Sequence, residues 1–162
     1  FLESVNVRIG RAVGWLTLAM VLVTFLIVVL RYALDSGWIW LQESVTWMHA
    51  AVFMLAAAYT LAREEHVRVD IFYRRFSPGT RALIDAAGAV FLLIPVALFF
   101  IAASWDYVLI SWQIHESSPE AGGLVYPLPS MLKSLIPMMS LMLLLQGLIL
   151  LVRSIRQLRS GV

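Results

Sequence analysis

Four side chains that could bind a metal or exchange protons crowd into one charged stretch, REEHVRVDIFYRRF at residues 63–76. They are Glu64, Glu65, His66 and Asp70, and on a helix the last two would share a face. Carboxylate and imidazole groups are ordinary zinc ligands, but a zinc site needs a nearly complete set of them. The chain has only three histidines and no cysteine, so it offers no second cluster to complete the set. We therefore expect a solvated charged loop and no metal.

The sequence also lacks the motifs of common enzymes. It contains no GxxxxGK, GxSxG or HExxH, so neither a P-loop, a nucleophile elbow nor a zincin helix is available. The absence of cysteine removes disulfides, thiolate ligands and a nucleophilic thiol. Only His49 lies within an apolar run, so a haem held by paired imidazoles is difficult to build. We predict a protein that is not an enzyme, with no catalytic residues and no cofactor.

The elements that carry these residues are strongly apolar. Hydrophobic residues make up 61% of the 162-residue chain and the mean hydropathy is +0.86, whereas soluble domains are about half apolar. Four stretches contain no charged residue over about one bilayer thickness: 12–30, 44–62, 86–105 and 134–152. The first is longer than the apolar core of a signal peptide and no small-residue cleavage motif follows it, so we expect an uncleaved span.

Lipid supplies no hydrogen bonds, so a backbone that crosses it must satisfy its own polar groups, as a helix does. The sequence therefore predicts an all-α membrane protein that forms a single domain over residues 1–162. Its four transmembrane helices are expected at about 12–33, 42–62, 82–110 and 130–153.

Basic residues are divided unequally between the two sides of these spans. One side carries most of them: Arg8, Arg11, Arg63, Arg68, Arg74, Arg75, Arg81, Arg153, Arg156 and Arg159. The other side carries only Arg31 and Lys133. Because cytoplasmic loops are enriched in lysine and arginine, both termini are predicted to lie in the cytoplasm.

The charged stretch then becomes the cytoplasmic loop between the second and third spans. Drawn as a helix, four of its apolar and aromatic side chains fall within an arc of about 100°: Val69, Phe72, Tyr73 and Phe76. Its charged side chains lie opposite: Arg68, Asp70, Arg74 and Arg75. Such a segment is typical of an amphipathic helix in the membrane plane, with arginines among lipid phosphates. Ser77 and Pro78 then provide an N-cap and a first-turn proline for the third span.

Polar groups within the spans are few. Arg31, Glu43 and Asp106 lie at span ends, where side chains can reach the interface and Arg31 can pair with either carboxylate. His49 lies about two turns inside the second apolar run, where we expect a hydrogen bond to a neighbouring helix. No carboxylate lies near the midplane, which argues against a proton relay.

Several short motifs occur in an order that resembles the small membrane subunit of TRAP transporters, the tripartite ATP-independent periplasmic uptake systems of bacteria and archaea. The first motifs are RY at 31–32, QE at 42–43, AAYTL at 57–61 and HVRVD at 66–70. The later ones are similar to a branch of the family labelled for mannitol or chloroaromatic uptake: ESSPEAGGL at 116–124, KSLIP at 133–137 and LLLQG at 143–147. The resemblance covers nearly the whole chain.

This resemblance implies a multi-pass protein of a bacterial or archaeal inner membrane. Its partners would be a periplasmic substrate-binding protein, a large multi-span subunit with sodium sites and a moving elevator domain, and membrane lipids, with no nucleic acid. The small subunit would brace the scaffold of the large one. Related chains often carry two acidic residues where this one has Gln42 and Glu43, so any role of the first acidic residue is not carried over.

Two functions are therefore weighed: a non-catalytic small subunit of a TRAP-type importer of organic acids or related solutes, and a self-sufficient four-helix channel or transporter acting as a homo-oligomer. For the first, residues expected to anchor partner or lipid are Arg31, Glu43, His49, His66, Arg68, Asp70, Arg74 and Arg75. Residues expected to form a platform in the outer loop are Glu116, Ser117, Ser118, Pro119, Gly122 and Gly123. The two glycines should permit a tight turn there.

Overall fold

The computed structural model describes residues 2–62, 73 and 75–160, with backbone alone for residues 2–13, 58, 62 and 160. Its helices are α1 (Leu2–Ala33), α2 (Ile39–Ala62), α4 (Pro78–Gly88), the π-helical turn η1 (Ala89–Leu93), α5 (Ile94–Gln113) and α6 (Leu128–Ser160). Across these described residues there is no strand. The predicted amphipathic helix falls largely on residues 63–72 and 74, which lie outside the described part of the chain.

Four helical stretches are long and apolar enough to cross a membrane, which confirms the prediction of an all-helical protein with four spans. They are Gly14–Ala33, Ile39–Leu61, Pro78–Gln113 and Leu128–Arg159. The third runs through α4, η1 and α5 without a break and is longer than the predicted span.

Local sequence explains how the third helix begins and where it changes pitch. The Ser77 hydroxyl accepts a hydrogen bond from the Thr80 backbone N–H at 3.2 Å and Pro78 follows in the first turn, as predicted. Pro95 has no N–H, and its ring would crowd the carbonyl of Phe91 in a regular α-helix. The wider π-helical turn directly before Pro95 relieves that crowding.

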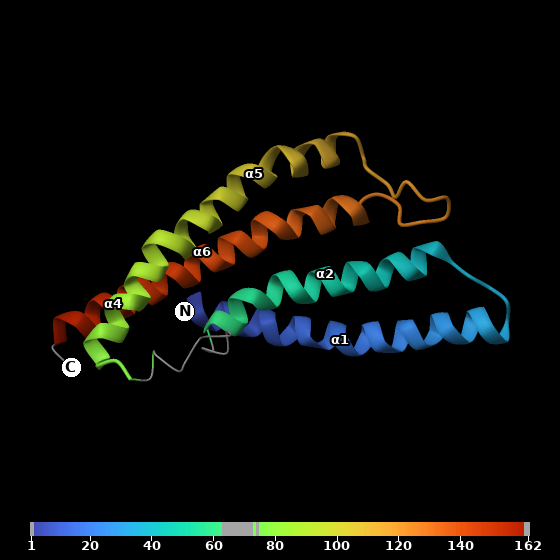
Figure 1. Cartoon of the computed structure of the whole chain (residues 1–162). Helices are drawn as coiled ribbons and strands as arrows, with labels where there is room; N and C mark the ends of the chain where they lie inside the picture. The colour runs from blue at the N-terminus through green and yellow to red at the C-terminus, as the bar shows by residue number, and fades with distance from the viewer. Residues whose placement is uncertain (1, 63–72, 74, 161–162) are drawn as a thin grey trace.

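The helices stand side by side in the order α1, α2, α6, α5 (Figure 1). α2 packs against α1 and α6, and α6 packs against α5 and α4, whereas α1 meets α6 only slightly. The row remains open at its edges, so α1 exposes Phe25 to 66% and α5 exposes Phe99 to 66%. Lipid or another membrane protein must cover these surfaces.

The interior of the row is thin and its buried side chains are mostly small. Leu55 of α2 and Met142 of α6 form the centre of the apolar core, with Leu16 of α1 packed against them. Some buried serines donate to their own helix, as Ser140 does to the carbonyl of Ile136 at 2.9 Å. Others donate across helices, as Ser111 of α5 does to the Ser130 hydroxyl of α6 at 2.9 Å. The helices therefore approach closely without leaving these polar atoms unpaired.

Candidate functional site: the loop end of the row

Both short connections described in the structure, 34–38 and 114–127, lie at one end of the row, opposite the chain termini (Figure 1). We call this the loop end, and residues 114–127 the long loop. All six residues of the predicted platform lie here, together with Arg31 and Glu43. These residues therefore form the candidate functional site.

The carboxylate of Glu43 fastens the long loop onto the start of α2. Its Oε1 accepts a hydrogen bond from the Ser118 hydroxyl at 2.5 Å, and its Oε2 accepts one from the Leu124 backbone N–H at 2.6 Å. Close by, the backbone N–H of Trp40 donates to the Gly122 carbonyl at 3.0 Å. An ionised carboxylate makes strong hydrogen bonds to such donors, so the loop of one helix pair is fixed to the other pair.

The two glycines of the long loop are needed for different reasons. Gly122 adopts φ +81°, a left-handed conformation that confirms the predicted tight turn. Gly123 instead leaves room for the Glu43 contact. A Cβ at Gly123 would lie 2.5 Å from the Ser118 hydroxyl oxygen and 2.7 Å from Glu43 Oε2.

Internal hydrogen bonds give the long loop a defined shape. The backbone N–H of Ser118 donates to the Leu124 carbonyl at 2.8 Å. The Ser117 hydroxyl accepts from the Tyr126 backbone N–H at 3.0 Å. Pro119 and Gly122 remain exposed at the tip. The loop can thus present a fixed surface beyond the helices.

A second polar cluster ties the loop to its own helix pair, α5 and α6. Lys133 Nζ of α6 donates to Glu116 Oε2 at 2.5 Å and lies 4.0 Å from the centre of the Tyr107 ring of α5. The hydrogen bond from Lys133 and a weaker one from Ser111 lower the pKa of Glu116 below its ordinary value. The start of the loop is therefore held by an ion pair with the first turns of α6.

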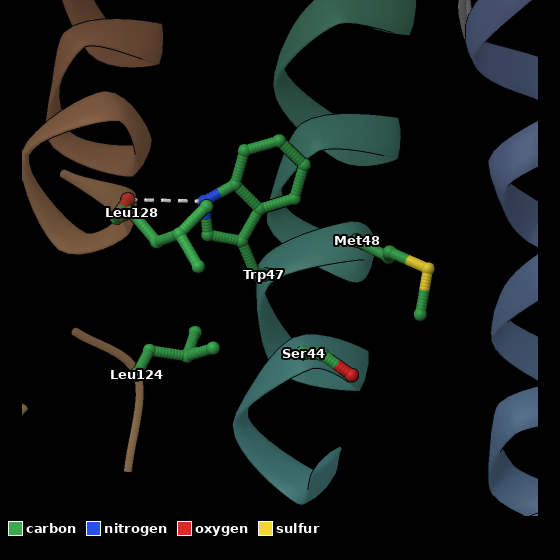
Figure 2. A pocket seen from close by; sticks show the side chains of 5 residues that line it. All are labelled: Ser44, Trp47, Met48, Leu124 and Leu128. Atoms are coloured by element: carbon green, nitrogen blue, oxygen red, sulfur yellow. Dashed lines mark hydrogen bonds between the residues drawn. The ribbon is translucent and has the colours of Figure 1, made fainter. Parts of the chain in front are cut away.

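Trp47 fills the space between α2 and the start of α6 (Figure 2). Its indole Nε1–H donates to the carbonyl of Leu128 at 3.2 Å. A hollow of about 130 Å³ beside it is lined by Ser44, Trp47, Met48, Leu124 and Leu128. Another of about 250 Å³ is lined by Glu43, Thr46, Trp47, Ser118, Pro119, Leu124, Pro129 and Leu132. Mostly apolar walls suit these hollows to a hydrocarbon group rather than to a polar solute.

The predicted anchoring residues are not all in one place. Arg31 lies in the last turn of α1, exposed, and within the described residues it forms no ion pair with Glu43 or Asp106. His49 is exposed on α2, away from the long loop, and Arg75 is exposed just before α4. Four further predicted residues lie outside the described part of the chain: His66, Arg68, Asp70 and Arg74. No group of metal-ligating side chains occurs in the part that is described.

Sequence reasoning missed several residues that hold the loop end together: Tyr107, Ser111, Lys133 and Trp47. Lys133 is the one lysine of the chain and falls at the start of a span, which is a usable signal for an interfacial ion pair. The position of Trp47 near the start of its helix also fits an interfacial aromatic. No sequence signal identifies their partners, because a loop of unknown path separates them.

Replacing Gly123 with alanine should loosen the long loop. The added methyl group would collide with the Ser118–Glu43 contact, and overpacking of this kind costs about 1–3 kcal/mol. We expect faster cleavage by a glutamate-specific protease at Glu116 and Glu120. Gly37→Ala is the matched control, because no atom lies within 4 Å of its Cβ position. Equal cleavage rates in the two variants would contradict the proposed role of Glu43.

The Glu116–Lys133 pair should give a stability difference that depends on pH. Because folding lowers the pKa of Glu116, the pair stabilises the fold above the unfolded value, about 4.3, and this contribution disappears as the pH falls through the lowered folded value. Melting temperatures of the parent and Glu116→Gln should differ at neutral pH and converge in acid. The difference should be absent in a Lys133→Met background. A difference that stays constant with pH would exclude the ion pair as its source.

Comparison with known proteins agrees with this architecture. A family model for the DctQ component of tripartite ATP-independent periplasmic transporters matches residues 20–157. The C4-dicarboxylate TRAP transporter small permease protein DctQ of Vibrio cholerae serotype O1 is 27% identical over 89 residues, which are 55% of this chain and 38% of that protein. No solved structure matches the chain. Since the family match runs from within the first span almost to the end of α6, the chain belongs to the DctQ family of small TRAP transporter subunits.

Proposed function

We propose that this chain is the non-catalytic small subunit of a TRAP-type secondary importer. It would brace the scaffold of a large elevator-type membrane subunit that takes up organic acids or related solutes with sodium. The observation that carries this proposal is the family match over residues 20–157. The Vibrio cholerae relative is named for C4-dicarboxylates. The motifs of the long loop lead us to place this chain in the mannitol or chloroaromatic branch, without assigning a substrate from that label.

The open row of helices supports a bracing role. A single layer exposes two broad faces, and no residue in the most apolar window of the first span is buried within the chain. The buried polar side chains among the described residues are Gln146 and five serines, and two of these serines bond carbonyls of their own helix. This arrangement suits a surface that packs beside a transport pathway better than the pathway itself.

The unequal distribution of basic residues supports an orientation for this subunit. Arg153, Arg156 and Arg159 follow the fourth apolar run at the end opposite the long loop, and Arg75 and Arg81 flank the start of α4. By the positive-inside rule that end faces the cytoplasm of a bacterium or archaeon, where the 63–76 segment would contact anionic lipid. The long loop then faces the periplasm and serves as a platform near the docked binding protein.

Reconstitution tests the subunit role. The chain, the large membrane protein encoded beside it and the binding protein would be placed in liposomes, and uptake of labelled organic acids measured with and without a sodium gradient. We expect uptake only when all three proteins and the gradient are present. Liposomes that lack only this chain are the control. Uptake by liposomes containing this chain alone would overturn the proposal in favour of a self-sufficient transporter.

A further inference from the structure

One exposed line of α2 carries polar side chains well inside the span. Gln42, Thr46, His49 and Phe53 are all exposed, and Phe53 is 74% exposed. Their spacing places them within an arc of about 60° at 100° per residue. We call this line the α2 stripe. It faces away from the apolar core formed by Leu55 and its neighbours.

The polar members of the α2 stripe have no hydrogen-bond partner within the described part of the chain. This holds for the side chains of Gln42, Thr46 and His49. Another exposed hydroxyl group in the spans behaves differently. Thr24 of α1, also exposed, donates to the carbonyl of Met20 at 2.8 Å. The stripe therefore combines exposure with unmet hydrogen-bonding capacity at three successive polar positions.

Because His49 lies inside the span, leaving its imidazole nitrogens without hydrogen bonds in lipid would cost free energy. It lies ten residues, or about 15 Å, along α2 from Ile39 in a 23-residue span, and six residues, or about 9 Å, beyond the loop contact of Glu43. A neutral imidazole carries one donor and one acceptor nitrogen, and hydrocarbon satisfies neither. The short side chain cannot reach the interface from that depth as lysine or arginine can. Such a residue is most stable against a protein surface that supplies hydrogen bonds.

The stripe is continuous with the larger hollow at the loop end. Thr46 belongs to both, and the hollow of about 250 Å³ adds Trp47, Leu132 and other mostly apolar walls. The Glu43 contact holds the loop side of this hollow in place. A preformed apolar hollow beside exposed polar groups is the arrangement by which one protein accepts an anchoring side chain of another.

We infer that the α2 stripe is the docking surface for a transmembrane helix of a second, larger membrane protein. That helix would present a carboxylate, hydroxyl or carbonyl oxygen to His49 and place an apolar side chain in the hollow beside Thr46. This inference rests on the proposed function, which supplies a larger subunit as the neighbour. It further specifies that the α2 stripe is the surface that contacts that subunit.

Site-specific photo-crosslinking tests the contact in membranes that contain this chain and its neighbouring transporter proteins. A benzophenone amino acid would replace Phe53 on the stripe, and Phe25 of α1 or Phe99 of α5 as controls, which are each 66% exposed. We expect an adduct with the large protein from Phe53 and none from the controls. An adduct from Phe25 or Phe99 alone would overturn the inference while leaving the subunit role intact.

The other crosslinking outcomes also decide between the two proposals. An adduct of Phe53 at twice the 18.2 kDa chain mass would identify a second copy as the occupant and overturn the inference. A complex that purifies intact but yields no adduct at Phe53 would overturn it too, leaving lipid on the stripe. Failure of the large protein to co-purify at all would overturn the proposed function itself.

Substitution of His49 tests the hydrogen bond. His49→Leu should weaken the affinity of the two membrane proteins about 3- to 30-fold, the range expected for a lost hydrogen bond between helices in a bilayer. His49→Gln, which keeps a donor and an acceptor, should recover most of the affinity. Thr24→Leu should have no effect, because its hydroxyl is already satisfied within α1. Equal affinity of His49→Leu and the parent would exclude a polar contact at this depth.

Discussion

The hydrocarbon core of a bilayer supplies no hydrogen bonds, and this constraint governs nearly every feature of the chain. It explains why the described spans are unbroken helices and why buried serine hydroxyls find partners within the protein, as Ser104 does in the carbonyl of Phe100 at 2.6 Å. It also explains why the irregular backbone at residues 114–127 lies at one end of the row. The polar side chains of the α2 stripe differ from this pattern, because no group in the described part of the chain forms a hydrogen bond with them.

The hydrogen bonds at the loop end join two helix pairs that share few other contacts. α2 and α6 meet through a small apolar core, so contacts between the two helix pairs are limited elsewhere. Glu43 joins them by accepting hydrogen bonds from the Ser118 hydroxyl and the Leu124 backbone. Lys133 and Glu116 close the other side of the same loop. The loop end is therefore held in one conformation, while the faces of the helix row remain exposed. Such an end is suited to fix the position of a bound partner.

The sequence was sufficient to predict the helices but not their arrangement. Long uncharged runs and the Ser77–Pro78 start gave four spans and one helix boundary, because both signals are local. The π-helical turn before Pro95 was not predicted, because a proline within an apolar run does not by itself specify a change of helical pitch. The order α1, α2, α6, α5 also could not be derived, because apolar faces of similar composition can pair in several ways in lipid.

The candidate site was predictable in part. Glu43, Ser118, Gly122 and Gly123 were each identified as site residues, yet their mutual contact was not. Ser118 lies 75 positions from Glu43, and only the folded path of the loop brings them together. Lys133 and Tyr107 were missed for the same reason. The exposure of His49 likewise depends on helix rotation, which an apolar run with weak periodicity does not fix.

The central claim is that this chain works as one small component of a larger membrane assembly. Native mass spectrometry of the affinity-purified material, released from lipid nanodiscs, tests that claim most directly. The account predicts a particle containing one copy of the 18.2 kDa chain and one copy of a larger membrane protein. Particles whose masses are only multiples of 18.2 kDa would contradict it and identify a homo-oligomer.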